Sequence, residues 1–399
     1  MLPLDSCGGS AAMNSDLQAL YEYPFARLRR LLEGLEPAAS PIDCSVGEPR
    51  GPLPDFVAPV LNQALEGFGR YPSTAGDPNL RAAIAQWLTD RYNLSSGMID
   101  PGRHIIPAFG TREALWSAAL AVFDRQWGGE IGLPNPFYQI YEGGALMAGA
   151  RPRYIPCGAD GKMDWQSLGE EQWEQLQALY VCSPGNPTGA VLNEQEWREL
   201  IAACRRHGVV LLADECYSEL YVDAPPVGVL QGCDGDLTGI LTFNSLSKRS
   251  GLPGLRAGFV AGDPELIAGF LNLRTYTGVA QPLPLAAVAE AAWCDEGHVA
   301  HNRELLAQRV DAFVSHFPRA ADGWSGAGMF VWLEVADGEA YARRAWGEQG
   351  VKVLPGIYLG RGQQGHNPGA GRVRIALVDD PDTLAEAGRR LNQMEKEGR

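Results

Sequence analysis

Three apolar runs of strand length in the middle of the chain most constrain its fold. They are "ALYVCSP" at 178–184, "VVLLADE" at 209–215 and "GILTFNS" at 239–245. Strands that are apolar on both faces are typical of a parallel sheet covered by helices. Between the first two runs lies "NEQEWRELIAACRRHG" (193–208), a helical pattern that ends at Gly208. The order strand, helix, strand predicts βαβ units around a buried parallel sheet, and so an α/β fold.

Polar residues follow these runs where the predicted strands end. A further strand is predicted at "HIIPAF" (104–109), and an amphipathic helix follows it over 111–123. In open parallel sheets, ligands bind beyond the carboxyl ends of the strands. We therefore expect a site built from the residues that follow the four runs: Gly110, Thr111, Asn186, Asp214, Tyr217, Ser245 and Lys248.

The order of predicted helices and strands changes near residue 290. Helical patterns at 298–317 and 340–350 alternate with predicted strands at 328–335 and 372–378, which suits a smaller α+β domain. We predict four parts. Residues 1–12 form a disordered N-terminal extension, and 13–50 pack with the small domain. Residues 51–290 form the large domain, and 291–399 form the small one.

Composition restricts the class of partner. The 399 residues include 33 basic and 48 acidic ones, giving a net charge of −15, which disfavours nucleic acid and anionic membranes. No window offers the roughly 20 apolar residues of a membrane-spanning helix, and the N-terminus does not read as a signal peptide. The eight cysteines and six histidines have no disulfide-scaffold or metal-ligand spacing. We expect a cytoplasmic protein without a metal site that acts on small molecules.

Lys248 lies in "NSLSKRSGLPGLRAGF" (244–259), among hydroxyl side chains and eight residues before Arg256. A nucleophilic amine needs a lowered pKa, which burial and a nearby cation provide. Taken alone, Lys248 could equally be an ordinary surface lysine. Asp214 alone could cap the next helix, and "CSPGNPTGAV" (182–191) alone could be a plain turn.

Together the same residues match one kind of ligand. Asp214 could meet a pyridinium nitrogen, and Tyr217 and Asn186 could lie beside a phenolic oxygen. Free N–H groups at the helix start in "FGTREAL" (109–115) favour a phosphate, and Lys248 could hold an aldehyde. An aromatic aldehyde phosphate with these features is pyridoxal 5′-phosphate (PLP).

Seven motifs of the chain resemble those of a known protein family. They are "RYPSTAGDPNLRAAIAQWL", "FGTREAL", "NPFYQIYEGGALMAGA", "SPGNPTGAV", "LADECYSELY", "NSLSKRSGLPGLRAGF" and "RVRIAL". In this order and spacing, the chain resembles the fold-type I PLP-dependent aminotransferases of class I/II over nearly its whole length. The resemblance implies a large domain with a mainly parallel sheet flanked by helices, and a smaller α+β domain.

The resemblance also implies roles around the cofactor. Lys248 would bind PLP covalently and then carry the proton between the substrate Cα and the cofactor. Asp214 would pair with the ring nitrogen, Asn186 and Tyr217 would bond the phenolic oxygen, and Tyr138 would stack on the ring.

The remaining implied roles concern the phosphate and the substrate. Arg374 would clamp the substrate α-carboxylate with its two-pronged guanidinium, and Gly47 would lie against the substrate. Tyr71 would reach the phosphate in the neighbouring subunit of a homodimer. The phosphate of the subunit's own cofactor would be bound by Gly110, Thr111, Ser245 and Arg256.

Within the class, motifs such as "YPFARLRRLL", "SVGEP" and "NPGAGRVRIALV" resemble bacterial N-succinyldiaminopimelate aminotransferases of the lysine pathway. These exchange an amino group between glutamate and N-succinyl-2-amino-6-ketopimelate. Here Gly251 and Leu252 stand where that family is expected to have Asn-Val. A substrate of this kind needs a cation or backbone donors for its distal carboxylates, for which Arg274, Arg361 and the loop 360–371 are candidates.

Other activities stay open at this stage. The chain could be an aromatic, aspartate or alanine type of aminotransferase, or a PLP β-lyase, decarboxylase or racemase. A PLP-binding regulator is disfavoured, because about 40 N-terminal residues are too few for a DNA-binding domain and the chain is acidic. A catalytically inactive homologue would lack the lysine, and Lys248 is present.

Overall fold

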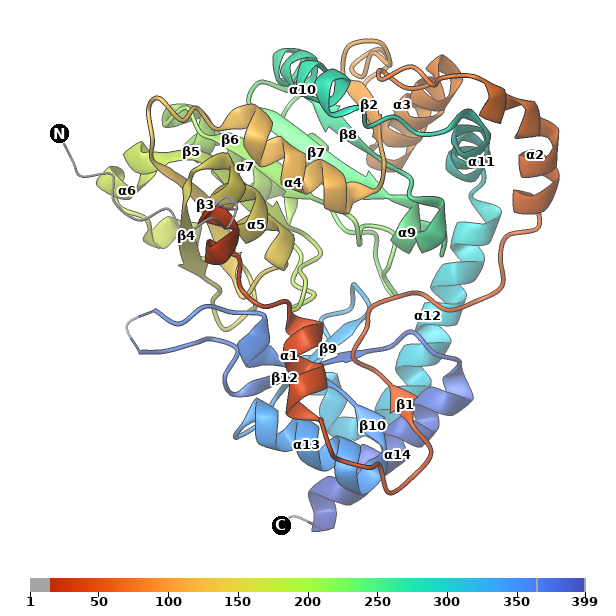
Figure 1. The fold of residues 1–399 in the computed structure, drawn as a ribbon, viewed down its shortest axis with the longest axis vertical. Helices are drawn as coiled ribbons and strands as arrows, with labels where there is room; N and C mark the ends of the chain where they lie inside the picture. The colour runs from red at the N-terminus through yellow and green to blue at the C-terminus, as the bar shows by residue number, and fades with distance from the viewer. Residues whose placement is uncertain (1–14, 364, 398–399) are drawn as a thin grey trace, which may run out of the picture.

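A seven-stranded sheet forms the centre of the larger, upper part of the molecule in Figure 1. The computed structural model describes residues 15–363 and 365–397, so the predicted extension at 1–12 lies outside the described residues. Only β8 runs antiparallel to its neighbours, and the other six strands share one direction. In spatial order the strands are β2 (Ile105–Ala108), β8 (Gly258–Gly262), β7 (Ile240–Ser245), β6 (Val210–Asp214), β5 (Leu176–Cys182), β3 (Glu130–Asn135) and β4 (Arg151–Pro156).

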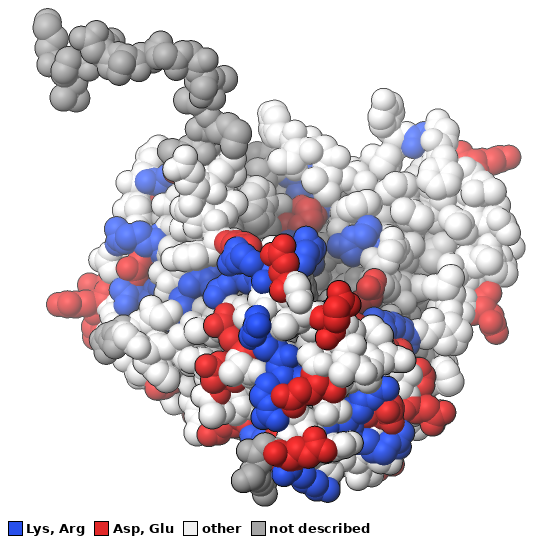
Figure 2. Space-filling view, turned by 60° about the horizontal axis from the view of Figure 1, so that its bottom comes forward, with Lys and Arg blue, Asp and Glu red and all other residues white. Residues whose placement is uncertain are grey.

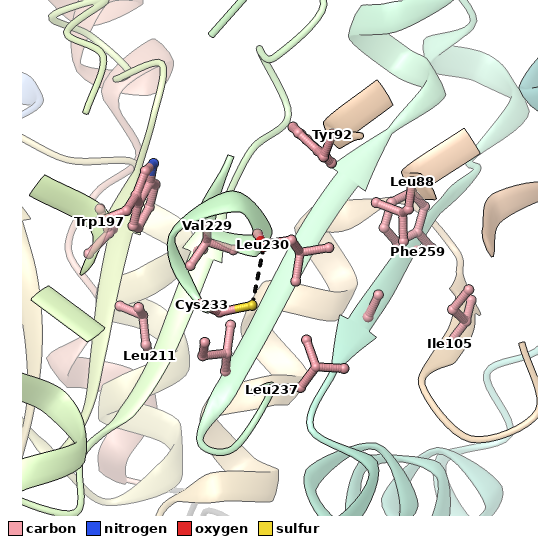
Figure 3. Packing of buried hydrophobic residues seen from close by; sticks show 14 of the residues in the cluster. Leu88, Tyr92, Ile105, Trp197, Leu211, Val229, Leu230, Cys233, Leu237 and Phe259 are labelled. Carbon is pink, nitrogen blue, oxygen red and sulfur yellow. Dashed lines mark hydrogen bonds between the residues drawn. The ribbon is translucent and has the colours of Figure 1, made fainter. Parts of the chain in front are cut away.

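Helices cover both faces of this sheet, which is why its central strands are apolar throughout. Tyr180 and Leu212 point to one face, where they join a core with α4 (Thr111–Val122), α5 (Gln139–Ala148) and α10 (Pro264–Thr277). Leu179 and Leu211 point to the other face. There they pack with α3 (Pro78–Tyr92), α7 (Glu194–Arg206), α8 (Val229–Gly232) and α11 (Leu283–Cys294). Figure 3 shows part of this second core, with Trp197 of α7 on one side.

A three-stranded antiparallel sheet lies in the C-terminal part, in the order β11 (Leu354–Pro355), β12 (Arg372–Ala376) and β9 (Phe330–Glu334). Its core includes Val331, Leu333 and Val373. Helices pack on it: α12 (Gly297–His316), α13 (Gly338–Gln349) and α14 (Pro381–Glu397).

The early part of the chain lies against this C-terminal sheet (Figure 1). Strand β1 (Ile42–Asp43) pairs in parallel with β10 (Val351–Lys352), and α1 (Pro24–Leu31) contacts β11. The short helix α2 (Val57–Ala64) packs on α11, α6 (Glu170–Gln175) directly precedes β5, and α9 (Leu246–Arg249) directly follows β7. The exact division at residues 50 and 290 stays a prediction.

The α/β class and the mainly parallel sheet predicted from the sequence are confirmed. No helix within the described residues is long and apolar enough to cross a membrane. On the face shown in Figure 2, acidic and basic side chains are intermixed over the C-terminal end of the molecule.

Candidate active site

A cavity of about 640 Å³ opens where the parallel strands end. This volume lies within the usual range for small-molecule sites. The ends of β6 and β7 supply Asp214 and Ser245, α9 supplies Lys248, and β12 of the small sheet supplies Arg374. The cavity brings together ten of the twelve predicted site residues: Gly47, Thr111, Tyr138, Asn186, Asp214, Tyr217, Ser245, Lys248, Arg256 and Arg374.

Lys248 is half-buried at the base of the cavity, where its Nζ donates a hydrogen bond to the carbonyl of Gly47. Burial lowers the pKa of this amine from 10.5 to about 8, and the nearby Arg374 and Arg112 add to the lowering. The Lys248 amine is therefore far closer to its nucleophilic form at neutral pH than a surface lysine is. Gly47 has to be small, since an added Cβ would lie 2.4 Å from the Phe330 ring.

Asp214 is a buried carboxylate held by two donors. The hydroxyl of Tyr141 donates to Oδ2 over 2.6 Å, and the backbone N–H of Cys216 donates to Oδ1 over 3.1 Å. Burial nevertheless raises the pKa of Asp214, because no cation is paired with it in the described residues. A positively charged ring nitrogen next to Asp214 would offset that cost.

Arg374 is a buried guanidinium without a carboxylate partner in the described part of the chain. It donates to the Asn186 side-chain oxygen and to the carbonyl of Ser45, both over 2.9 Å. Its Nε has no partner, and burial lowers the pKa of Arg374 to about 10. Asn186 also donates to the Tyr217 hydroxyl over 3.3 Å. Arg374, the predicted clamp for the α-carboxylate, is thus joined through Asn186 to Tyr217, and Asn186 and Tyr217 are the two residues predicted to bond the phenolic oxygen.

The start of α4 forms the other end of the cavity. Gly110 stands before the helix with a φ of 80° and no side-chain cap, so N–H groups of the first turn are available to an anion. A Cβ on Gly110 would lie 2.3 Å from Nη2 of Arg256, which brings these two residues into close contact. Thr111 is the first residue of the helix and does not cap it; its hydroxyl lies 2.9 Å from Cys216 Sγ instead.

The Ser245 hydroxyl accepts the backbone N–H of Ser247 over 3.1 Å beside Lys248. Tyr71, by contrast, is fully exposed and is not part of this cavity. Its predicted contact is with a second subunit, and that contact stays a prediction.

The two arginines expected to bind a distal carboxylate of the substrate are already paired with carboxylates of the protein. Arg274 donates to the Glu113 carboxylate, with Nη1 to Oε1 at 2.7 Å, and is fully buried. Arg361, in the loop 360–371, donates to Glu142 with Nε to Oε1 at 2.7 Å. Neither arginine lines the cavity and both are already paired, so nothing in the described residues supports either one as the partner of a distal carboxylate.

Sequence reasoning missed Tyr141 and Arg112. Tyr141 lies in the first turn of α5, three residues after Tyr138, which directly precedes the helix, and the two ring centroids are 5.7 Å apart. Arg112 directly follows Thr111 and donates from Nε to the Tyr138 hydroxyl over 2.8 Å. Most of the other lining residues stand in motifs quoted from the sequence but were given no role there: Tyr23, Pro24, Phe25, Val46, Glu48, Gln139, Cys216, Ser247, Pro253 and Gly254. Phe330, Leu354 and Leu359 lie outside those motifs.

These residues fit PLP in both charge and hydrogen bonding. The unpaired donors at the start of α4, together with Arg256 and Ser245, suit a phosphate. The buried Asp214 suits a pyridinium, and the Lys248 amine, with its lowered pKa, suits an aldehyde.

Comparison with known proteins places the chain in a family. It matches the aminotransferases of class I and II over residues 39–391. A probable aminotransferase of Mycobacterium tuberculosis is 35% identical to this chain, covering 97% of this chain and 89% of that protein.

Two solved structures are similar as well. An aminotransferase of Neisseria meningitidis superposes with a TM-score of 0.89 at 39% identity, covering 97% of this chain and all of that one. A probable N-succinyldiaminopimelate aminotransferase of Thermus thermophilus has a TM-score of 0.80 at 25% identity, covering 95% of this chain and all of that one. The chain therefore belongs to the class I and II aminotransferases, a PLP-dependent family of the fold-type I architecture.

Proposed function

We propose that this protein transfers an amino group between glutamate and N-succinyl-2-amino-6-ketopimelate. The products are 2-oxoglutarate and N-succinyl-LL-2,6-diaminopimelate, and the reaction belongs to diaminopimelate and lysine biosynthesis. The similarity to the Thermus thermophilus structure, which is described as a probable N-succinyldiaminopimelate aminotransferase, supports the choice of substrate. The motifs shared with that family support it independently.

The single observation that most supports a 2-amino or 2-oxo acid substrate is the state of Arg374. This guanidinium is buried, has no carboxylate partner in the described residues and keeps one unpartnered nitrogen. A buried cation of this kind is costly to leave unpaired. An α-carboxylate would relieve that cost with two parallel hydrogen bonds.

Each residue of the cavity then has a defined task. Bound PLP supplies an electron sink for negative charge at the substrate Cα. Lys248, whose amine has a pKa of about 8, takes up and returns the proton at that carbon. Asp214 keeps the ring nitrogen charged, and Asn186 links the Tyr217 hydroxyl to Arg374.

The proposal includes a cytoplasmic homodimer. Tyr71 is a fully exposed aromatic side chain, which suits a contact with the cofactor phosphate of a second subunit. The seven cysteines of the described residues are free thiols, which suits a reducing compartment.

Two half-reactions test the proposal. Glutamate should convert the cofactor of the holoenzyme to its amine form, and the succinylated keto acid should return it to the aldehyde form. Inertness towards that acid, together with turnover of an aromatic or short aliphatic oxo acid, would assign a different aminotransferase. Release of ammonia and pyruvate from a β-substituted amino acid would favour the β-lyase alternative.

A further inference from the structure

The cavity contains four cationic side chains, of which three have a task. Arg256 lies at the phosphate end, Arg374 receives the α-carboxylate, and Lys248 is the reactive amine. The fourth is Arg112, on the first turn of α4. No ion pair joins any of the four to a carboxylate within residues 15–363 and 365–397.

Arg112 is exposed at the cavity and has no carboxylate partner in the described residues, whereas the two arginines considered above are buried and paired. Glu113, its neighbour in the chain, is paired with Arg274 and is not available to it. Glu142 is likewise paired with Arg361. The only bond that the described residues make with the Arg112 guanidinium comes from Nε to the neutral Tyr138 hydroxyl at 2.8 Å.

The surroundings of Arg112 favour an anion. It stands at the N-terminal end of a twelve-residue helix, where the helix dipole adds positive potential. The cavity lining also includes the apolar side chains Phe25, Leu354 and Leu359, which suit the methylene groups of a long substrate. A guanidinium matches the geometry of a carboxylate better than an ammonium does.

We infer that Arg112 binds the remote carboxylate of the substrate and selects dicarboxylic amino and oxo acids. This inference rests on the proposed function and deepens it, because glutamate and the succinylated keto acid both carry a remote carboxylate. One cation then serves both half-reactions. Arg112 replaces Arg274 and Arg361 as the residue for this task.

The experiment uses the holoenzyme and a matched pair of unreactive ligands, glutarate and pentanoate. Both have five carbons, and only glutarate has a second carboxylate. Calorimetry gives the dissociation constants for the wild type, Arg112→Gln and the exposed control Arg103→Gln, which lies outside the cavity. We expect Arg112→Gln to raise the dissociation constant of glutarate at least about tenfold, because one charge-assisted contact is lost. The dissociation constant of pentanoate should change less than about twofold. Arg103→Gln should leave both constants unchanged.

A second variant tests whether the preference for glutarate depends on the charge of Arg112 or on its contact with the Tyr138 hydroxyl. Tyr138→Phe keeps the charge of Arg112 and removes the hydroxyl that it contacts, so the preference for glutarate should persist. The inference is overturned if Arg112→Gln binds glutarate as the wild type does, if it weakens both ligands equally, or if Tyr138→Phe loses the preference to the same extent. If glutarate is selected by Arg112 but the succinylated keto acid is not a substrate, the proposed function fails and the role of Arg112 stands.

Discussion

Tyr141 donates a hydrogen bond of 2.6 Å to Asp214 Oδ2 at the end of β6. The phenol ring is fully buried and stacks on Tyr180 at a centroid distance of 4.7 Å, so the hydroxyl is held in place. Asp214 in turn accepts the N–H of Cys216. The orientation of the carboxylate that faces the cavity is therefore fixed from behind by α5.

Tyr141→Phe should loosen this carboxylate without emptying the site. A hydrogen bond to a charged group contributes about 1.5–3 kcal/mol, and its loss raises the pKa of Asp214 further. We expect kcat to fall about tenfold while PLP remains bound, measured by steady-state kinetics and by the cofactor content of the purified variant. Unchanged kcat together with an unchanged pH profile would contradict a positioning role for Tyr141.

Asp214→Asn should have a larger effect on turnover. An amide does not supply the negative charge that keeps the ring nitrogen protonated, and preorganised contacts of this kind are worth on the order of 10²–10³ in kcat. The variant should fold and retain PLP through the phosphate and Lys248. Turnover within about threefold of the wild type would remove Asp214 from its assigned role.

The pKa of Lys248 predicts how fast the apoenzyme captures PLP at different pH. Only the neutral amine attacks the aldehyde, and with a pKa of about 8 the neutral fraction rises from roughly a tenth at pH 7 to roughly nine tenths at pH 9. The rate should therefore rise about tenfold over this interval and then level off. An amine with the ordinary pKa would give a rise of about a hundredfold with no plateau below pH 10.

The pairing of Arg361 with Glu142 makes a prediction about stability. Both side chains are buried, so Glu142→Ala would leave an unpaired cation and should destabilise the fold by about 3–5 kcal/mol. Glu334 pairs with Arg372 at the surface, and Glu334→Ala should cost at most about 1 kcal/mol. Denaturant unfolding of both variants gives the comparison. Equal losses would mean that the Arg361–Glu142 pair is not a structural ion pair.

The sequence was sufficient to predict the central strands and most of the predicted site residues that line the cavity. The runs that became β5, β6 and β7 are almost wholly apolar, and the residues after them meet because parallel strands end at one edge. Strands β3 and β4 were not predicted, because "EIGLPN" and "RPRYIP" contain glycine and proline, which weaken the strand signal.

Long-range pairing was beyond sequence reasoning for a different reason. Arg274 meets a carboxylate 161 residues away, and Arg361 meets one 219 residues away, so neither partner is marked by local spacing. Gly251, which stands where the related family is expected to have asparagine, has a local explanation. Its φ is 63° and the space around it is open, a conformation that asparagine also tolerates, so Gly and Asn are interchangeable there.

The position of the covalent PLP adduct tests the assignment of Lys248 most directly. The holoenzyme is reduced with borohydride and digested, and the peptide that carries the cofactor is identified by mass spectrometry. We predict a single labelled lysine, Lys248, and no label in Lys248→Ala. A label on another lysine in the wild type, or one that persists in Lys248→Ala, would contradict it.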